Sequence, residues 1–392
     1  MDKDIFIIGC RGLPASYGGY ETFVEQLTHG RKNEHIHYHV ACRTSSKIEN
    51  NERFEYNNAD CFKVFVPQIG PAQPIYYDLK AVKNSVQYVK QHNIVKPIFY
   101  VLGCSVGPFV IRMKRLIASV DGKIFINPDG HEWMRAKWGL FARKYLKFSE
   151  QIMVKNADLV ICDSDSIEKY IQKSYQKFEP VTTFIAYGAN ITRSNLKDDD
   201  QIFLNWLEKF DLKKHEYYLI VGRFVPENNY ETMIREFMKS KTNKDLIIIT
   251  NVEQNSFYEK LKEETKFTRD KRVKFVGTVY NENLLKKIRE MSFAYLHGHS
   301  VGGTNPSLLE ALASTKVNLL YNVGFNSEVA AKGAWYWSLK RGHLSNLINN
   351  AEKLTDNEIH ELDKKSTDRI RKYYSWEKIV QQYETVFYRT VL

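Results

Sequence analysis

Short apolar runs alternate with amphipathic stretches along almost the whole chain, and this alternation constrains the fold more than any other feature. In the first half, runs that are apolar and rich in β-branched or aromatic residues occur at residues 5–8, 37–42, 62–66, 98–102, 123–126, 159–162 and 182–185. Helical periodicity separates them at residues 20–31, 75–92, 106–119 and 139–156. Strands that are apolar on both faces and alternate with helices predict a parallel sheet covered on both sides.

The alternation lapses after residue 188 and then resumes, which divides the chain in two. Residues 188–215 are polar and include the acidic run 198–200. A second series follows, with apolar runs at residues 217–221, 246–250, 273–276, 293–296 and 317–320. A chain of 392 residues also exceeds the size of one ordinary core.

We therefore predict an α/β fold with two Rossmann-like domains. The expected first domain covers residues 1–190, an interdomain stretch covers 191–216, and the second domain covers 217–356. Residues 357–392 are amphipathic and rich in aromatic side chains. We expect them to form terminal helices that pack back on the first domain.

The composition restricts the compartment and the partners. The apolar runs are too short to span a bilayer, and the N-terminus reads as a first strand rather than a secretory signal. Five cysteines without a C-x-x-C spacing indicate a reduced, cytoplasmic protein. The net charge of +11 predicts an anionic partner such as nucleic acid, anionic lipid or a diphosphate. Because the aromatic and zinc-finger patterns of nucleic-acid binders are absent, we expect no nucleic acid.

Two loops in the second half follow predicted strands and carry residues suited to a diphosphate. Arg223 comes directly after the strand at 217–221, where its guanidinium could fork onto phosphate oxygens or form a surface salt bridge. The glycine-rich loop 297–305 leads into a helix with Pro306 in its first turn, so its free amides could form an anion cradle. Glu310, about one turn later, could accept hydrogen bonds from a sugar hydroxyl.

Two loops in the first half offer further candidates, each with a simpler alternative. Gly18 and Gly19 precede a helix and could let backbone amides approach an anion, or they could form a structural turn. Asp129 follows the strand at 123–126 and is a candidate catalytic carboxylate. The alternative is an ordinary Asp-Gly turn at Asp129 and Gly130.

Together these motifs resemble a known family. GRFVPENN, from residue 222, and HSVGGTNPSLLEA, from residue 299, are similar to the donor-site motifs of glycosyltransferase family 4, which has the GT-B fold. With IIGCRGLPASYGGYETFVE and DGHEWMRAKW, they resemble a narrower group of bacterial rhamnosyltransferases of capsule and cell-wall rhamnopolysaccharide synthesis. Those enzymes use dTDP-L-rhamnose and a sugar acceptor linked to polyprenyl diphosphate.

The resemblance implies a site with defined roles. Two Rossmann-like domains would face a central cleft, with the nucleotide on the C-terminal domain, the acceptor on the N-terminal domain, and retention of anomeric configuration. Asp129 and Glu227 would act at the reacting centre. The residues expected to bind the donor are Gly18, Gly19, Arg223, Asn228, His299, Gly303, Thr304, Asn305, Ser307 and Glu310.

Two positions depart from the wider family pattern. The first of two glutamates separated by seven residues falls at Gly302, and a common lysine is replaced by Asn228. Sugar recognition and stabilisation of the leaving group must therefore be partly reassigned. A changed sugar pocket is consistent with a 6-deoxy sugar such as rhamnose.

A basic and aromatic run at residues 133–148 lies on an expected helix. Functionally it suits contact with anionic lipid at the inner face of the cell membrane, which a lipid-linked acceptor requires. The alternative is a helix packed on the sheet with extended lysine side chains. The candidate membrane and acceptor contacts are Trp133, Arg135, Lys137, Trp138, Arg143 and Lys144.

The sequence thus predicts a retaining, metal-independent glycosyltransferase that is cytoplasmic and peripheral on the membrane. No cofactor is expected besides the dTDP-sugar donor, because the acidic groups at 163–165 and 198–200 fit a helix cap and an interdomain stretch better than a metal site. The alternatives are a family-4 transferase with a UDP-hexose donor, or a sugar-nucleotide-binding protein without catalysis. The sequence leaves open whether the protein forms a homo-oligomer.

Overall fold

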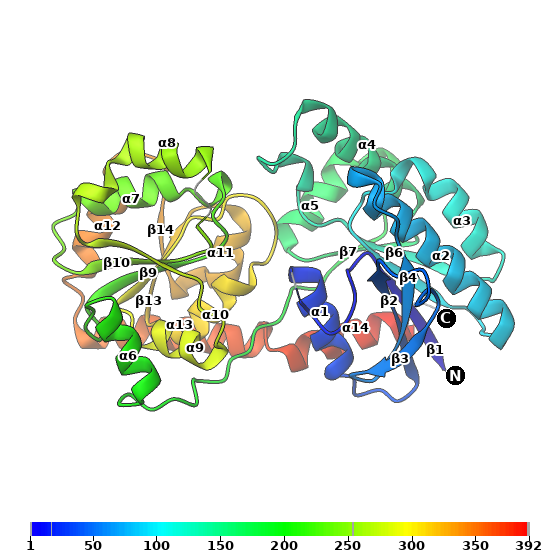
Figure 1. The fold of residues 1–392 in the computed structure, drawn as a ribbon, viewed down its shortest axis with the longest axis horizontal. Helices are drawn as coiled ribbons and strands as arrows, with labels where there is room; N and C mark the ends of the chain where they lie inside the picture. Colours follow the sequence, from blue (N-terminus) through cyan, green and yellow to red (C-terminus); the bar gives the residue numbers. More distant parts are fainter. Residues whose placement is uncertain (1, 17, 253–254, 390–392) are drawn as a thin grey trace. The chain divides into compact units, whose positions relative to one another are not determined.

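The computed structural model describes residues 2–16, 18–252 and 255–389 and contains two compact units (Figure 1). The first unit combines the chain up to Gly188 with the segment that begins at Trp376, and the second is Ala189–Ser375.

The first unit is built on an eight-stranded sheet in the order β3-β4-β2-β1-β5-β6-β7-β8. The strands are β1 (Lys3–Ile8), β2 (Ile36–Thr44), β3 (Arg53–Tyr56), β4 (Ala59–Phe65), β5 (Ile98–Leu102), β6 (Lys123–Asn127), β7 (Leu159–Cys162) and β8 (Thr182–Phe184). All neighbours are parallel except the β3–β4 hairpin. The strand order reverses between β1 and β5, which is where open α/β sheets bind ligands at their carboxyl edge.

Helices cover both faces of this sheet. Phe6 and Phe99 point into a core shared with α2 and α3, whereas Tyr100 packs against Tyr383 and Phe387 of the C-terminal helix α14. The helices are α1 (Gly19–His29), α2 (Gln73–His92), α3 (Val110–Ala118), α4 (Leu140–Asn156), α5 (Asp165–Ser174) and α14 (Trp376–Arg389), with 3₁₀ turns η1 (Gly70–Ala72), η2 (Gly107–Phe109), η3 (Glu132–Met134) and η4 (Gln176–Phe178).

The second unit has a six-stranded, all-parallel sheet in the order β11-β10-β9-β12-β13-β14. The strands are β9 (Tyr217–Val221), β10 (Asp245–Ile249), β11 (Val273–Gly277), β12 (Ala294–His297), β13 (Val317–Tyr321) and β14 (Trp335–Trp337). The order reverses between β9 and β12, so the loops that leave these two strands lie side by side.

The helices of the second unit surround this sheet (Figure 1). They are α6 (Gln201–Lys209), α7 (Tyr230–Lys239), α8 (Ser256–Thr265), α9 (Glu282–Glu290), α10 (Pro306–Ser314), α11 (Gly324–Ala330), α12 (His343–Ala351) and α13 (Asp356–Tyr373), with 3₁₀ turns η5 (Pro226–Asn228), η6 (Phe267–Arg269) and η7 (Ala331–Gly333). None of the described helices of either unit is long and apolar enough to cross a membrane.

The predicted α/β class with two Rossmann-like parallel-sheet domains is confirmed. The segments between and after the domains differ in detail from the expected bounds. The stretch 191–216 contains α6, which packs on α9 within the second unit, and the segment 357–392 is shared. Helix α13 packs on α10 and α11 in the second unit, and only α14 returns to α1 in the first.

A buried ion cluster joins three strands of the first sheet at their amino ends. His39 of β2 contacts Asp4 at 2.8 Å through Nε2 and Asp60 at 3.2 Å through Nδ1, and its side chain is only 7% exposed. His39 is buried because β2 lies inside the sheet, between β4 and β1. Burial disfavours the imidazolium, but the two carboxylates outweigh it, and the pKa of His39 is raised above 6.5.

This cluster predicts a pH-dependent contribution of His39 to stability. Because the folded pKa is raised, protonated His39 should stabilise the fold fully below pH 6.5, and this stabilisation should disappear as the pH rises through the folded pKa. Denaturant unfolding of the wild type and His39→Gln should show a difference that is largest at acidic pH and shrinks towards pH 9.

His35→Gln is the matched control, because His35 pairs with Asp2 at the surface and is 62% exposed. It should change the free energy of unfolding little at any pH. A His39→Gln difference that is independent of pH would contradict the interpretation.

Candidate functional site

The loops after β9 and β12 are hydrogen-bonded to each other at the carboxyl edge of the second sheet. The Asn229 side-chain amide donates to the Gly298 carbonyl at 2.7 Å, and the Ser300 backbone N–H donates to the Glu227 carbonyl at 3.0 Å. Within the first loop, the Asn228 amide donates to the Arg223 carbonyl at 2.8 Å. These bonds bring the two predicted donor-site motifs together.

His299 and Asn228 form the centre of this arrangement. Nδ1 of His299 lies 2.6 Å from Oδ1 of Asn228, and both residues are 8% exposed. Gly302 has a φ of 131°, and a Cβ at that position would lie 3.2 Å from Nε2 of His299. The imidazole thus occupies space beside both positions at which the chain departs from the wider family pattern.

The loop ends in a capped helix N-terminus. The Asn305 side chain accepts a hydrogen bond from the Leu308 N–H, and Pro306 lies in the first turn of α10. The hydroxyl of Ser307 donates to the Val221 carbonyl at 3.2 Å, which ties the helix to the end of β9. Gly303 and Thr304 are buried just before this turn. A helix N-terminus at the end of a parallel strand favours an anionic group.

Glu310 is held by a buried cation. Its Oε2 lies 2.7 Å from the Arg289 guanidinium, which is 2% exposed, whereas the Glu310 side chain is 38% exposed. Arg289 also donates to the Ser307 hydroxyl at 3.2 Å. The buried Arg289 therefore orients the Glu310 carboxylate, which is still exposed to solvent. A group that accepts hydrogen bonds from a ligand must be accessible in this way.

Three buried polar atoms of the residues described above or next to them have no hydrogen-bond partner among the described residues. They are Nε2 of His297, Oε2 of Glu227 and Nε of Arg289. Burial, together with the neighbouring His299, lowers the pKa of His297 well below its usual value, so this imidazole is neutral at pH 7. Our sequence analysis missed His297, although it directly follows an apolar run and precedes Gly298. Unpaired buried polar atoms are rare and mark positions where a ligand can bind.

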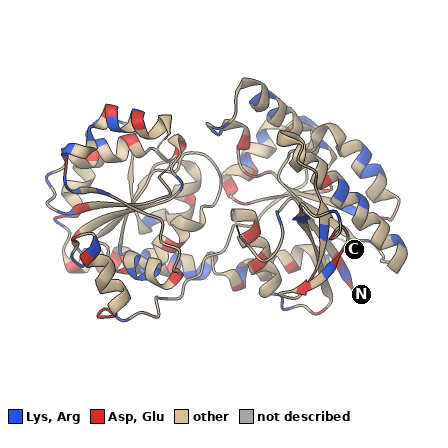
Figure 2. Ribbon diagram, in the orientation of Figure 1, with Lys and Arg blue, Asp and Glu red and all other residues tan. Residues whose placement is uncertain are grey.

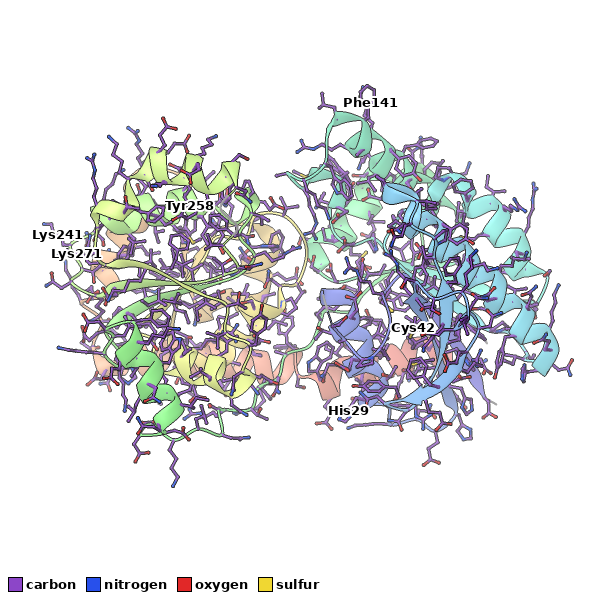
Figure 3. The ribbon with its side chains drawn as sticks, viewed as in Figure 1. His29, Cys42, Phe141, Lys241, Tyr258 and Lys271 are labelled. Carbon is purple, nitrogen blue, oxygen red and sulfur yellow. The ribbon has the colours of Figure 1, made fainter. Side chains whose placement is uncertain are left out.

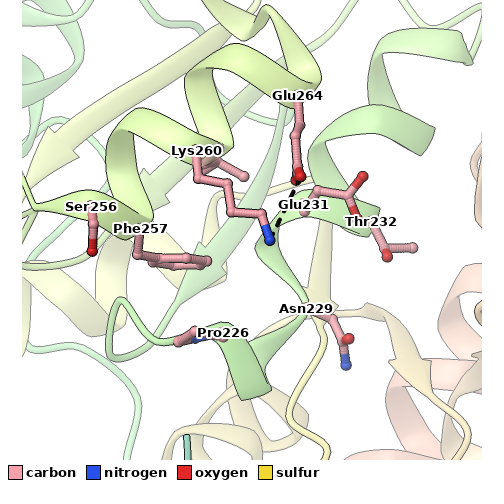
Figure 4. Close-up of a pocket in the computed structure, with 9 residues that line it drawn as sticks. Pro226, Asn229, Glu231, Thr232, Ser256, Phe257, Lys260 and Glu264 are labelled. Atoms are coloured by element: carbon pink, nitrogen blue, oxygen red, sulfur yellow. Dashed lines mark ion pairs between the residues drawn. The ribbon is translucent and has the colours of Figure 1, made fainter. Parts of the chain in front are cut away.

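Arg223 lies at the exposed surface of its loop. Its position after β9 matches the expectation, and its guanidinium is accessible to a ligand. A separate pocket of about 440 Å³ opens between α7 and α8 (Figure 4). Pro226 and Asn229 border it, but none of the predicted donor residues lines it, so we do not assign the donor to it.

Asp129 lies just beyond β6 in the first unit, in a left-handed conformation with a φ of 51°. Its backbone N–H donates to Oδ1 of Asn127 at 2.9 Å, and its carboxylate lies 3.8 Å from Arg135. Burial raises the pKa of Asp129, and the carboxylates of Glu132 and Asp163 add to the rise against the effect of Arg135. The structure thus makes Asp129 a carboxyl that readily holds a proton.

Gly18 and Gly19 belong to the first unit, whereas the other predicted donor residues belong to the second. Gly18 precedes α1 with a φ of 103°. Oε1 of Glu21, in the first turn of α1, accepts a hydrogen bond from the Arg11 N–H at 2.7 Å, and a Cβ at Gly18 would lie 2.7 Å from Oε2. An internal carboxylate therefore lies where the loop was expected to approach an anion.

The predicted membrane contacts are only partly exposed. Arg135 binds Glu132, Trp138 donates to Glu132 at 3.0 Å, and Arg143 donates to the Trp138 carbonyl at 2.9 Å. Trp133 is also partly buried. Lys137 and Lys144 are exposed. The basic run therefore serves the fold of the first unit as well as its surface.

Comparisons with known proteins fit this geometry. Residues 2–190 match the profile of the domain of unknown function DUF1972, and residues 204–373 match that of glycosyl transferases group 1. No curated protein matches the sequence.

Solved structures match over almost the whole chain. Sucrose-phosphate synthase from Thermosynechococcus elongatus has a TM-score of 0.77 at 16% identity and covers 99% of this chain and 98% of its own. An E. coli trehalose-6-phosphate structure bound with UDP-2-fluoro glucose has a TM-score of 0.74 at 9% identity and full coverage of both chains. Anabaena HepE in complex with UDP and glucose has a TM-score of 0.70 at 12% identity and covers 99% and 100%.

These structures establish the GT-B fold for the whole chain. With the profile match over residues 204–373, they support a glycosyltransferase of the GT-B type. The interlocked loops after β9 and β12 lie within the matched region.

The pairing of Glu310 with Arg289 predicts two effects of Glu310→Gln. On the expectation from the sequence that Glu310 binds the donor nucleotide, the variant should bind dTDP at least about tenfold more weakly, since a charged acceptor contributes roughly 1.5–3 kcal/mol to a hydrogen bond. It should also unfold more easily, because the buried Arg289 loses its counter-charge. Calorimetry of dTDP binding and thermal unfolding measure the two effects separately.

Glu361→Gln is the matched control on the surface of α13, where Glu361 pairs with Lys365 and both side chains are at least half exposed. It should leave both quantities unchanged. Unaltered dTDP affinity in a folded Glu310→Gln protein would exclude Glu310 from nucleotide binding.

Proposed function

We propose that this GT-B glycosyltransferase transfers L-rhamnose from dTDP-L-rhamnose, with retention, to a glucose or N-acetylglucosamine linked to polyprenyl diphosphate. The product belongs to a bacterial surface polysaccharide of the capsule or cell wall. The observation that carries the proposal is the pair of interlocked loops after β9 and β12, with an exposed arginine on one and a helix N-terminus on the other. The rhamnose donor and the lipid acceptor rest on the motif resemblance.

The donor diphosphate is the group that suits this edge of the second sheet. The amides that precede α10 and the guanidinium of Arg223 supply positive charge for the leaving diphosphate. Glu310 accepts hydrogen bonds from the nucleotide sugar, which in dTDP offers only the 3′-hydroxyl. Because these groups already stabilise negative charge, no divalent ion is required for the reaction.

The sugar lies beside His299 and Asn228 in this proposal. A glutamate at position 302 and a lysine at 228 would place charge next to the sugar, whereas this chain has a glycine and a neutral amide there. The less charged pocket suits a 6-deoxy sugar. His297 and Glu227 each contribute an unpartnered buried atom that a hydroxyl of the donor can satisfy.

On the acceptor side, Asp129 orients the attacking hydroxyl and accepts its hydrogen bond. The departing diphosphate takes the proton on the same face from which it leaves, which retains the anomeric configuration without a covalent intermediate. Glu227 holds donor hydroxyls and supports the cationic sugar of the transition state. The protein acts by positioning both substrates and stabilising charge.

Transfer assays with purified protein test the reaction and the role of Arg223. The wild type should transfer sugar from dTDP-L-rhamnose to lipid-diphosphate glucose or N-acetylglucosamine, detected by mass spectrometry, and EDTA should leave the rate unchanged. Arg223→Ala should lower kcat/KM by about 100-fold, as the loss of one charged contact to the diphosphate predicts.

Arg193→Ala is the control, because Arg193 is an exposed arginine of the second unit outside the two loops. Faster transfer from a UDP-hexose would favour that alternative donor. Binding of dTDP without any turnover would favour the non-catalytic alternative, and loss of activity in EDTA with rescue by Mg²⁺ would contradict metal independence.

We further propose that the first unit docks on the cytoplasmic face of the membrane, where a lipid-linked acceptor resides. Residues 107–120 and 133–149 contain eight Lys and Arg residues and no Asp or Glu. On η2, α3, η3 and α4 they expose the apolar side chains Phe109, Ile111, Met134, Leu140, Phe141 and Phe148. Figure 2 shows the basic residues on these helices, and Figure 3 shows Phe141 at the outer end of α4.

We therefore propose Phe141 and its exposed apolar neighbours as membrane contacts in place of Trp133, Arg135, Trp138 and Arg143. Lys137 and Lys144 remain the proposed basic contacts. Phe141 is 91% exposed and Leu140 is 75% exposed, which is unusual for large apolar side chains on one helical turn. Apolar insertion flanked by cations is the pattern of a helix that lies on an anionic lipid surface.

Vesicle sedimentation tests this surface. The protein should bind vesicles that contain phosphatidylglycerol, and Phe141→Ser should weaken binding about tenfold, since burying a phenylalanine side chain contributes roughly 1.5–3 kcal/mol. Tyr280→Ser, which alters a 90% exposed aromatic residue of the second unit, is the control. Equal binding of wild type and Phe141→Ser would exclude this surface.

A further inference from the structure

Asp129 lies in an unusual backbone segment. Asp129, Gly130 and His131 have φ angles of 51°, 34° and 57°, so three consecutive residues adopt left-handed conformations and two of them carry side chains. Such conformations persist only where surrounding contacts determine them. The contacts that hold this loop therefore decide where the Asp129 carboxylate lies.

A cation in an aromatic cage lies beside the loop. Nζ of Lys147, on α4, is 4.7 Å from the ring centroid of Trp133, 4.6 Å from that of Tyr170 and 5.0 Å from that of Tyr175. It also donates a hydrogen bond to the Tyr170 hydroxyl and lies 3.3 Å from Oε1 of Glu150. We call these five residues the Lys147 cage.

The Lys147 cage is neutralised and hydrogen-bonded internally. Glu150 is 3% exposed, and its Oε1 accepts hydrogen bonds from the hydroxyls of Tyr170, at 2.6 Å, and Tyr175. The ammonium and carboxylate are thus paired beside three aromatic rings, with Glu150 buried and the Lys147 side chain 38% exposed.

The Lys147 cage contacts the loop that contains Asp129 through two residues, His131 and Trp133. The His131 ring lies 4.2 Å from the Tyr170 ring, and Trp133 belongs both to the cage and to η3, which directly follows the left-handed residues. Arg135 holds the loop from its other end, because it binds Glu132 and lies 3.8 Å from Asp129.

We propose that the Lys147 cage is a positioning device for Asp129. By fixing His131 and Trp133, it keeps residues 129–131 in the left-handed conformation that directs the Asp129 carboxylate to the acceptor hydroxyl. Lys147 touches no substrate and acts through Asp129. The inference rests on the role of Asp129 in the proposed function, and it explains why the basic aromatic run faces inward at Trp133.

The test compares Lys147→Met, which keeps the length and removes the charge, with Lys147→Arg, which keeps a cation over the rings. Lys147→Met should lower kcat for transfer about 10- to 100-fold, because small displacements of a positioning group have effects of that size. The donor KM and dTDP affinity should stay within about twofold, because the donor loops belong to the second unit. Lys147→Arg should restore most of kcat.

Lys155→Met is the matched control on the same helix, where an exposed lysine lies over the Phe178 ring at 5.4 Å, away from the loop. Its kcat should equal that of the wild type. Should Lys147→Met not fold, Trp133→Leu removes one wall of the cage without leaving Glu150 unpaired, and it should lower kcat in the same way.

A double-mutant cycle with Asp129→Asn separates positioning from general stability. In the Asp129→Asn background, Lys147→Met should have little further effect on kcat, because both changes remove the same contribution. Independent, multiplicative losses would overturn the proposal, and so would a Lys147→Met enzyme with a lowered melting temperature and normal kcat.

Hydrogen exchange distinguishes failure of this inference from failure of the proposed function. Lys147→Met should speed amide exchange at residues 129–135 and leave the loops at 222–229 and 298–305 unchanged, whether or not transfer is observed. Faster exchange without any wild-type transfer would reject the proposed function alone. Unchanged exchange at residues 129–135 would reject the cage as a positioning device.

Discussion

The close approach of Gly298 to the Asn228 carbonyl is the constraint on which the geometry of the two loops of the proposed donor site depends. A Cβ at Gly298 would lie 2.3 Å from that oxygen, so only glycine permits the contact. The contact allows the Asn229 side chain and the Ser300 backbone to join the loops after β9 and β12. Both strands are buried in a parallel sheet, so their ends are fixed. The loops that leave these ends are therefore held in place as well. His299 and the α10 N-terminus are thereby placed before any ligand arrives, which is the condition for electrostatic preorganisation.

The positive charge of the chain is used in two different ways. Arg289, Arg135 and Lys147 each pair with a partly or fully buried carboxylate, so they orient side chains rather than attract a distant partner. The exposed lysines and arginines of α3 and α4 remain available for an anionic surface. A net charge of +11 therefore cannot be assigned to one partner from composition alone. The position of each cation relative to its carboxylate decides whether it supports the fold or a ligand.

Most of the fold could be predicted because buried parallel strands leave a strong apolar signal. Strand β3 was missed, since Arg53–Tyr56 is short and polar, although the Asn57-Asn58 pair with positive φ angles is a recognisable hairpin turn. Helix α6 lies in the stretch that was expected to join the domains. Its large apolar residues Phe203 and Trp206, which are buried, indicate a helix that packs on a domain. The loop motifs predicted which segments meet in the second unit. They could not show that His297 is neutral and unpartnered, or that Arg289 holds Glu310, because both depend on packing between elements distant in sequence.

In each unit an arginine lies beside a carboxylate that the proposed function assigns to a substrate hydroxyl. In the proposed function each of two carboxylates acts on a hydroxyl. Each then needs a fixed direction and an internal ion pair that leaves one of its oxygens accessible. In the second unit, Arg289 binds one oxygen of Glu310 from beneath and leaves the group at the surface. In the first unit, Arg135 pairs closely with Glu132 and stays 3.8 Å from Asp129, so it orients that carboxylate without neutralising it. Burial then raises the pKa of Asp129 to about 8, so at pH 7 the carboxyl is mostly protonated and can donate a hydrogen bond as well as accept one. The left-handed loop at residues 129–131 and the Lys147 cage beside it hold the Asp129 carboxyl in this position.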